Sequence, residues 1–375
     1  MSIQKKDLSQ FSTNHDFYPE TRLLVTIKSF DLKAIRERYL KNRNKKSNRT
    51  GSVNRRETAI GGIAEVTLHQ GKLKNLQILT RLPEPRGIDS VRGLTAFSSE
   101  NKVYLLSNDQ IKTIENPWFS YIHTTDIQRS GGNRLLVSSS GFDCIFEYDV
   151  EEKNKTFEWF AWENGFDHGM DPETGENLYL TRSGEKAKEY EKQSKRYIHI
   201  EDPENQTLPT AKRAAFINSV VYDPTDANGI IATFFHEGAV YKIDRKTSQA
   251  KKLLDGLINP HGGMKLDDGR IMGTSTKGGE VVLQSAQAQT RYDFSNIPGK
   301  PEFLSDFEWI QNSIYTKEGD ILSIDSNRNC FVIFNPDSGY IDFIPYNENW
   351  AVQDLIESSA SPSERKTLAG LFTSQ

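Results

Sequence analysis

One short pattern recurs along most of this sequence. Each copy begins with a polar residue, often His or Asn, continues through a turn signal, and ends in an apolar run closed by Ser or Thr. The copies start at His15, Arg92, His123, His168, Asn218, His261 and Asn312. A unit this short buries its apolar face only against neighbouring copies, so such a chain folds as a repeat architecture. No other feature of the sequence restricts the fold as strongly.

Two further alternating runs follow most copies. The clearest second runs cover residues 143–149, 238–244, 279–284 and 329–335. Apolar and polar residues alternate in them between Gly, Asp, Asn and Pro clusters, which is typical of half-buried strands. Four short strands per unit are typical of propeller blades. We therefore predict an all-β fold, a single β-propeller of seven four-stranded blades, with six blades as the alternative count. A β-sandwich with regular turn spacing is the competing fold.

The domain organisation follows from the repeats. A chain of 375 residues would ordinarily form two or three domains. The repeats instead predict one propeller domain over residues 1–350 and a helical tail over residues 351–375. Ser361-Pro-Ser-Glu in that tail is a good helix start, with Ser361 as the N-cap, Pro362 in the first turn and Glu364 reaching back.

Two insertions interrupt the strand pattern, at residues 30–58 and 183–196. The first combines a helical stretch with a basic string, and holds nine Lys and Arg against one acid between Arg36 and Arg56. The predicted strands place both insertions on the face where the innermost strands begin, which indicates a partial cover over the channel. The basic string is either a solvated loop or attracts an anionic substrate or lipid surface. No aromatic residues interleave with its charges, which disfavours nucleic acid.

Composition excludes several classes. The formal net charge of −4 is unlike that of a nucleic-acid binder. No apolar stretch approaches the roughly 18 residues of a membrane helix, and we expect no membrane span. Without a signal peptide, and with only Cys144 and Cys330, the sequence favours a reducing cytoplasm. No Gly-rich phosphate loop or known catalytic motif is present, so we expect no nucleotide cofactor.

Histidines supply the main chemical signal. The same repeat position, where an innermost strand begins, carries His15, His123, His168 and His261. Such positions converge on the channel axis, and imidazole is a common ligand of transition metals. We therefore predict that these four histidines bind one divalent transition metal, Fe or Zn. A purely structural role, capping loops between blades, is the alternative for each.

Other polar residues near the same face complete the predicted site. We expect catalytic roles for His123, His236, Asp126 and Glu237, as acid, base or metal-supporting groups. The residues expected to bind substrate are Asn218, Asn259, Asn312, Trp309 and Gln311.

The units at residues 218–244 and 259–283 resemble the repeats of gluconolactonase, strictosidine-synthase and virginiamycin-lyase-like propellers. The run from His123 to Ser139 is also similar to a motif of arylsulfotransferase propellers. Resemblance to the lactonases implies a divalent-metal site of Asn and acidic residues, which only Asn218, Asn259 and Asn312 match. Histidines at the other positions disfavour calcium-type lactonase chemistry. A His-rich site on the channel axis instead resembles that of carotenoid-cleaving oxygenases.

These observations predict a small-molecule enzyme with a His-lined site at the central channel. It would be a metal-assisted or His acid/base hydrolase or lyase, and the basic insertion favours an anionic substrate. A non-catalytic propeller scaffold that binds a protein or ligand on the insertion-bearing face is one alternative. A His-ligated iron oxygenase is the other.

Overall fold

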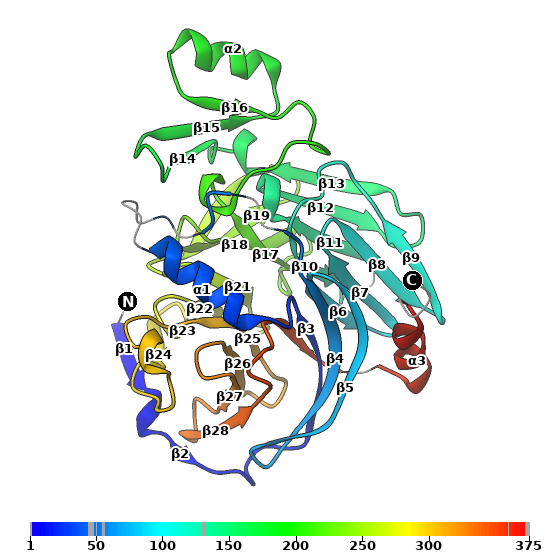
Figure 1. Ribbon diagram of the computed structural model, residues 1–375, viewed down its shortest axis with the longest axis vertical. Coiled ribbons are helices and arrows are strands. Elements are labelled where there is room, and N and C mark those ends of the chain that lie inside the picture. Colours follow the sequence, from blue (N-terminus) through cyan, green and yellow to red (C-terminus); the bar gives the residue numbers. More distant parts are fainter. Residues whose placement is uncertain are drawn as a thin grey trace.

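The computed structural model of this protein describes residues 2–43, 49, 51–54, 57–129, 133–358 and 360–371. In these ranges most regular structure is β, arranged as sheets around a central axis (Figure 1). The alternating runs found in the sequence form the strands. Parts of the basic string (residues 44–48, 50 and 55–56) lie outside the described residues.

Four blades consist of strands that follow one another in the chain, listed from the innermost strand outward. Blade 1 contains β6 (Pro85–Val91), β7 (Leu94–Ser99), β8 (Lys102–Ser107) and β9 (Gln110–Ile114). Blade 2 contains β10 (Ile122–Ile127), β11 (Arg134–Ser139), β12 (Cys144–Asp149) and β13 (Lys155–Phe160). Blade 3 contains β17 (Ile217–Tyr222), β18 (Gly229–Phe234), β19 (Ala239–Asp244) and β20 (Ala250–Leu254). Blade 4 contains β21 (Pro260–Lys265), β22 (Ile271–Ser275), β23 (Glu280–Gln284) and β24 (Ala288–Asp293).

The last two blades combine both ends of the chain. Blade 5 contains β25 (Ile310–Tyr315), β26 (Ile321–Asp325), β27 (Cys330–Phe334) and β28 (Tyr340–Pro345). Blade 6 contains β29 (Val352–Glu357), β3 (Thr21–Ile27), β4 (Ile60–His69) and β5 (Lys72–Pro83). Two N-terminal strands, β1 (Ser2–Asp7) and β2 (Ser12–Thr13), pair in parallel with β24 and β28 at the outer edges of blades 4 and 5.

Six innermost strands close the ring in the described part of the chain. Their contacts run from β29 to β6, β10, β17, β21 and β25, and back to β29. β29 is the innermost strand of blade 6 and pairs antiparallel with β3, so the C-terminal region closes a sheet begun by the N-terminal region. The predicted tail boundary is therefore corrected: residues 352–357 belong to the propeller, because their alternating side chains fill the inner position of blade 6.

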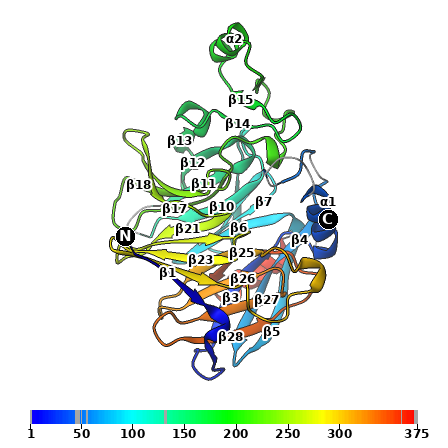
Figure 2. The same ribbon diagram turned by 90° about the vertical axis from the view of Figure 1, so that its left-hand side faces the viewer.

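The predicted seventh blade is also corrected. The segment at His168 forms a separate three-stranded sheet of β14 (His168–Met170), β15 (Asn177–Thr181) and β16 (Tyr197–His199). β15 and β16 pair in parallel and are linked through helix α2 (Gly184–Lys192), which lies within the insertion predicted at 183–196. That insertion packs on the projecting sheet and does not line the channel mouth, so its predicted role in a cover is corrected. Figures 1 and 2 show this sheet and α2 projecting from one side of the ring. His15 itself lies in a turn after β2, and the rest of its copy forms β3, the second strand of blade 6, rather than an innermost strand.

The apolar core is divided into layers between blades. One cluster joins Val137 and Phe146 of blade 2 to Ile230 and Phe234 of blade 3. Side chains alternate between the two faces of a strand, and each blade packs both faces against its neighbours, so consecutive residues of inner strands such as β18 and β26 are buried. Cys144 and Cys330, at the first residues of β12 and β27, are buried in these layers, as expected of small core residues.

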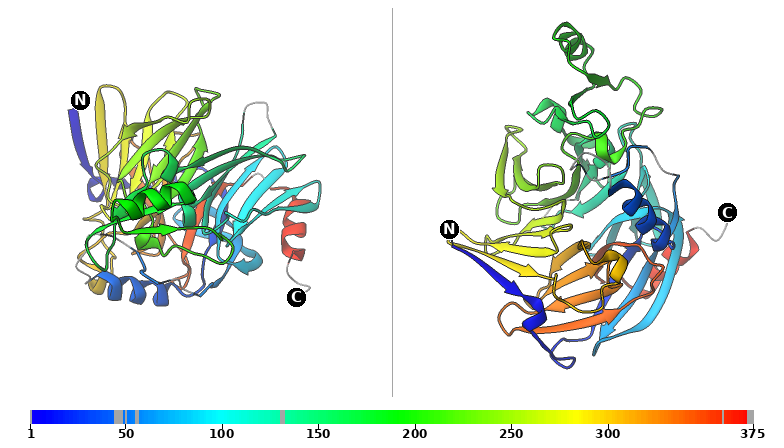
Figure 3. Two further views of the ribbon diagram at one scale, coloured as in Figure 1. Left: turned by 90° about the horizontal axis from the view of Figure 1, so that it is seen from above. Right: turned by 60° about the vertical axis from the view of Figure 1, so that its left-hand side comes forward.

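Two helices flank the ring. Helix α1 (Leu32–Arg43) begins after Asp31, whose carboxylate accepts from the amide of Ala34 at 2.9 Å, and lies over one face of the ring (Figure 3). Helix α3 (Pro362–Gly370) has the predicted capping box between Ser361 and Glu364. It packs against β5 on the outside of the ring. In the described residues, no helix has the length and apolar character needed to cross a membrane.

Candidate functional site

Each innermost strand presents one side chain at the same structural position, where the strand starts. We call these six the ring residues: Arg86, His123, Asn218, His261, Gln311 and Gln353. The register of pairing with the second strand shifts at or just after each of them. Such bulges bend a strand and redirect its side chains, and here they occur at the same end of every innermost strand. That end of the channel is the channel mouth.

The backbone repeats as well. Two residues before the ring residue, Glu84, Tyr121, Phe216 and Asn259 all have left-handed φ angles, between 36° and 53°. Glycine follows Arg86 and His261 for steric reasons. A Cβ on Gly87 would lie 2.5 Å from the Cα of Thr124, and one on Gly262, where φ is 58°, would lie 1.9 Å from the Oδ1 of Asn312. The innermost strands therefore approach one another too closely for side chains at these points.

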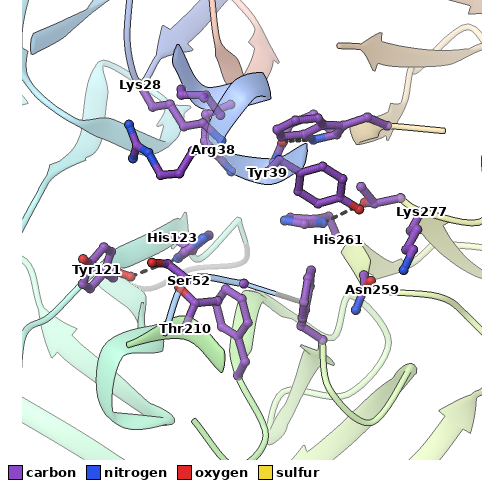
Figure 4. Close-up of a pocket in the computed structure, with 18 of the residues that line it drawn as sticks. Lys28, Arg38, Tyr39, Ser52, Tyr121, His123, Thr210, Asn259, His261 and Lys277 are labelled. Atoms are coloured by element: carbon purple, nitrogen blue, oxygen red, sulfur yellow. Dashed lines mark hydrogen bonds between the residues drawn. The ribbon is translucent and has the colours of Figure 1, made fainter. Parts of the chain in front are cut away.

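A cavity of about 320 Å³ lies at the channel mouth. Five of the six ring residues line it: Arg86, His123, His261, Gln311 and Gln353. Helix α1 covers it with Ile35, Arg38 and Tyr39, and residues 51–54 cover it from another side. Figure 4 shows His123 and His261 facing this space from different strands, with Arg38 and Tyr39 on the helix beside it. The volume is within the range of small-molecule pockets.

The cover is attached to several parts of the ring. The guanidinium of Arg36 donates to the backbone oxygens of Ser326 and Asn327 in blade 5 and, at 2.8 Å, to Oδ1 of Asn329. Arg49 donates to the carbonyl oxygens of Arg213 and Ala214, just before blade 3. Arg36 and Arg49 of the insertion thus contact two different parts of the ring, blade 5 and the segment before blade 3. Among the described residues of the insertion, helix α1, Arg49 and residues 51–54 lie at the channel mouth.

Positive charge predominates in the cavity. Its described lining contains five cationic side chains, Lys28, Arg38, Arg49, Arg86 and Lys277, and one carboxylate, Glu308. Glu308 is itself paired with Lys300 and, at 3.0 Å, with Arg328. The cavity therefore retains an excess of positive charge, which favours an anionic ligand.

His123 is held by a buried polar chain. Glu84 Oε2 accepts from Arg86 at 3.0 Å, and Arg86 donates at 3.1 Å to Nε2 of His123. Nδ1 of His123 then donates to the carbonyl oxygen of Tyr121 at 3.0 Å. Burial, and the charge of Arg86 next to it, lower the pKa of His123 well below its ordinary value. His123 is therefore a neutral imidazole with both nitrogens engaged.

His261 is the other cavity histidine. Its Nδ1 lies 2.8 Å from the hydroxyl of Thr276, and its ring packs edge-on against Phe235. Burial, followed by the positive charges of Lys28 and Arg86, lowers the pKa of His261 to about 3. It is neutral at physiological pH. A bound anion would raise this pKa, because a nearby negative charge favours the imidazolium.

Aromatic rings form part of the wall. Tyr39 of α1 lies 5.0 Å from Phe307 and 5.3 Å from Trp309, measured between ring centroids. The indole N–H of Trp309 donates at 2.8 Å to Oε1 of Gln311. Phe216 and Phe235 line the cavity near the histidines. The pocket thus combines flat apolar walls with cationic groups.

The structure brings together some of the residues singled out from the sequence. His123, His261, Asn259, Trp309 and Gln311 all line the cavity.

Two of the expected substrate-binding residues lie elsewhere. Asn218 is buried and donates at 2.7 Å to the carbonyl of Pro260, and Asn312 donates at 2.7 Å to Asp354. Both amides link neighbouring innermost strands, which places them in the packing of the channel wall.

Three expected catalytic residues are also outside the cavity lining. His236 donates from Nε2 to the carbonyl of Thr210 at 3.0 Å, and burial lowers its pKa well below the ordinary value. Glu237 is exposed. Asp126 lies three residues further along β10 than His123, where it accepts from Arg129 and the amide of Tyr222, and burial raises its pKa to about 7.

The four histidines expected to share a metal are not assembled. His15 pairs with Asp342 in the outer strand of blade 5 at 2.7 Å. His168 lies in the projecting sheet, bonded to Asp167 at 2.9 Å and stacked on Tyr179. Over the described ranges, no three His, Cys, Asp or Glu side chains are grouped to hold a metal ion. The repeat pattern predicts that His15 and His168 begin innermost strands, but in the structure neither residue belongs to an innermost strand of the ring.

Several lining residues were not identified from the sequence. Arg86 was missed because the copy at Arg92 starts one strand too late, and Gln353 because residues beyond 350 were assigned to the tail. A signal for Arg86 existed: Pro85-Arg86-Gly87 matches Pro260-His261-Gly262. Lys28, Arg38 and Lys277 carry no repeat signal, because they reach the cavity from the insertion and from connecting loops.

Comparisons with known proteins show the fold. No protein-family model and no curated protein matches the sequence. A structure of a nidogen/laminin complex is similar, with a TM-score of 0.53 and 8% identity over 89% of this chain and 97% of that chain. A protein of unknown function from Bacteroides caccae is similar with a TM-score of 0.51 and 11% identity, over 90% and 98% of the two chains. A streptogramin B lyase structure has a TM-score of 0.44 and 13% identity, over 73% and 93%. The likenesses with TM-scores above 0.5 support the β-propeller fold.

Proposed function

We propose that this protein is an enzyme that binds a small anionic molecule at the channel mouth and acts on it as a hydrolase or a lyase. One observation carries the proposal: five cationic side chains face a covered cavity. Of the five, Arg86 is paired with Glu84. The single carboxylate of the described lining, Glu308, is already paired with Lys300 and Arg328. A bound carboxylate or phosphate would lie among these cations and against the aromatic wall.

Neutral His261 is the proposed base. It lines the cavity, whereas both nitrogens of His123 are engaged, so His123 positions Arg86 rather than accepting a proton. When the anion binds, its charge raises the pKa of His261 and makes the imidazole a stronger base. Proton transfer to His261 would then start either attack by water or elimination. No metal is part of this proposal.

Anion binding is tested by calorimetric titration with benzoate and with the neutral benzamide. We expect benzoate to bind more tightly, and Arg38→Gln or Lys277→Gln to weaken it about fivefold each, since one partly exposed ion pair contributes about 1 kcal/mol. Lys33→Gln, an exposed charge of α1 that does not line the cavity, is the matched control. Equal affinity for benzoate and benzamide would reject an anion site.

Catalysis is tested by screening anionic aryl esters and lactones for turnover. His261→Gln should lower the rate at least a hundredfold, the usual contribution of a general base, and should still bind benzoate. An unchanged rate in this variant would exclude His261 as the base. Absence of turnover in the native protein, together with benzoate binding, would leave anion binding as the function.

A further inference from the structure

Gln353 is a buried amide of the cavity with an unmet hydrogen-bonding atom. It is 4% exposed and lines the cavity, and its Oε1 has no partner in the described part of the chain. Gln311, at the equivalent position of the neighbouring blade, accepts from the indole of Trp309. A buried acceptor without a donor lowers the stability of the protein by about 1–3 kcal/mol, so such atoms usually have a hydrogen-bond partner in the functional state.

The neighbouring ring residue, Arg86, has a buried hydrogen-bond donor without an acceptor among the described residues. Arg86, on β6, is 5% exposed and lines the same cavity, and its Nε–H has no acceptor. Strands β29 and β6 are in contact, so the unmet acceptor and the unmet donor come from adjacent innermost strands. Both atoms are shielded from solvent here, and the broad terminal torsion of a glutamine lets its amide turn toward the cavity that it lines.

We infer that the ligand of this pocket carries an amide group beside its anionic group, with its N–H on Gln353 and its C=O on Arg86. The inference rests on the proposed anion site and adds the chemical group that the ligand carries beside its anionic group. An amide is planar and presents a donor and an acceptor on separate atoms, which matches two partners from different strands. The aromatic side chains of Tyr39, Trp309, Phe216 and Phe235 accommodate a planar group of this kind.

Three probes of nearly equal shape test the inference by calorimetric titration of the full chain. Hippurate has a ring, an amide and a carboxylate. In 3-benzoylpropanoate the amide N–H is replaced by CH₂, and in hippuramide the carboxylate is replaced by a neutral amide. We expect hippurate to bind at least tenfold more tightly than either of the other two. Equal affinity for hippurate and 3-benzoylpropanoate would overturn the inference and leave the anion site standing.

A variant assigns the effect to Gln353. Gln353→Met removes the acceptor at similar volume, so the preference for hippurate over 3-benzoylpropanoate should fall to about one. Gln77→Met, the same change on the exposed side of β5, should keep it. A preference that persists in Gln353→Met overturns the assignment. Equal binding of hippurate and hippuramide rejects the anion site, on which the inference depends, and binding of none of the probes rejects both.

Discussion

At the scale of single residues, hydrogen bonds link Glu84, Arg86 and His123 in a buried network at the channel mouth. All three side chains are buried, and Oε1 of Glu84 also accepts from the amide of Ala59, at the end of the insertion, at 3.2 Å. These hydrogen bonds therefore connect the end of the insertion to the residues that line the cavity. A buried ion pair that loses one partner leaves an uncompensated charge.

We predict that Glu84→Gln lowers the free energy of unfolding by about 3 kcal/mol, because Arg86 would keep its charge without a carboxylate. Urea unfolding measures this change. Glu204→Gln, an exposed carboxylate, is the control and should change stability by less than about 0.5 kcal/mol. A Glu84→Gln effect as small as that of the control would show that the pair is not a stabilising element.

The lowered pKa values of the buried histidines predict how the stability of the fold depends on pH. His261 has a folded-state pKa of about 3 against an ordinary value of 6.5, chiefly through burial. Between these values the unfolded chain takes up a proton that the folded chain does not. Stability is therefore complete above pH 6.5 and falls as pH decreases toward 3, by about 1.4 kcal/mol per pH unit for such a group.

His261→Gln should reduce this loss of stability between pH 6.5 and 4.5, measured as urea unfolding at several pH values. The remaining slope belongs in part to His123 and His236, whose pKa values are also lowered. His168→Gln, on the exposed histidine of the projecting sheet, is the matched control. An identical pH profile for His261→Gln and the native protein would contradict the low pKa.

At the scale of elements, helix α1 is attached to the ring by polar contacts of one side chain and aromatic contacts of another, all with residues far along the chain. Arg36 fastens it to the turn between β26 and β27, while Tyr39 packs on Phe307 and Trp309. Its other face, with Lys33 and Glu37, is exposed. The helix is thus held by a few contacts at the edge of the cavity rather than by a broad apolar face.

We predict that Arg36→Met speeds amide hydrogen exchange across residues 32–43 and weakens benzoate binding, because α1 would open more often. Exchange in β26 and β27 should stay unchanged. Lys33→Met, on the exposed face, is the control. If Arg36→Met left exchange in α1 at the native rate, its bonds to Ser326, Asn327 and Asn329 would not be what holds the cover.

At the scale of the whole molecule, the ring depends on a strand from each end of the chain. β29 fills the inner position of blade 6, and its neighbours β25 and β6 belong to the blades on either side. Without it, blade 6 would lose its innermost strand and blades 5 and 1 would lose a contact. Helix α3 follows on the outside and is no part of the ring.

We predict that truncation after residue 350 abolishes cooperative unfolding, since it removes β29 and opens the ring. Truncation after residue 358 removes α3 but keeps β29, and should retain a cooperative transition at lower temperature. Thermal unfolding followed by circular dichroism distinguishes the two. A cooperative native-like transition in the shorter chain would show that closure by β29 is not required.

Much of the local structure follows from the sequence because strands, turns and caps depend on neighbouring residues. The apolar run closed by Ser gives β11, alternation gives β12 and β19, and the Ser361-Pro-Ser-Glu run gives the start of α3. His123 and His261 were recognised as mouth residues because each starts an innermost strand in a regular copy. His15 and His168 have the same local sequence pattern as His123 and His261. They differ from them only in the tertiary structure, because neither lies in an innermost strand of the ring.

By itself, the sequence determined that this chain forms four-stranded β units with an insertion over the face where their innermost strands begin, since periodicity and turn chemistry are local properties. The tertiary structure decided how many units close the ring, that residues 352–357 belong inside it, and which side chains share the cavity. These depend on contacts between residues far apart in the chain. Arg86 and Gln353 line the same cavity only because β29 closes the sheet begun by β3, which places β29 beside β6.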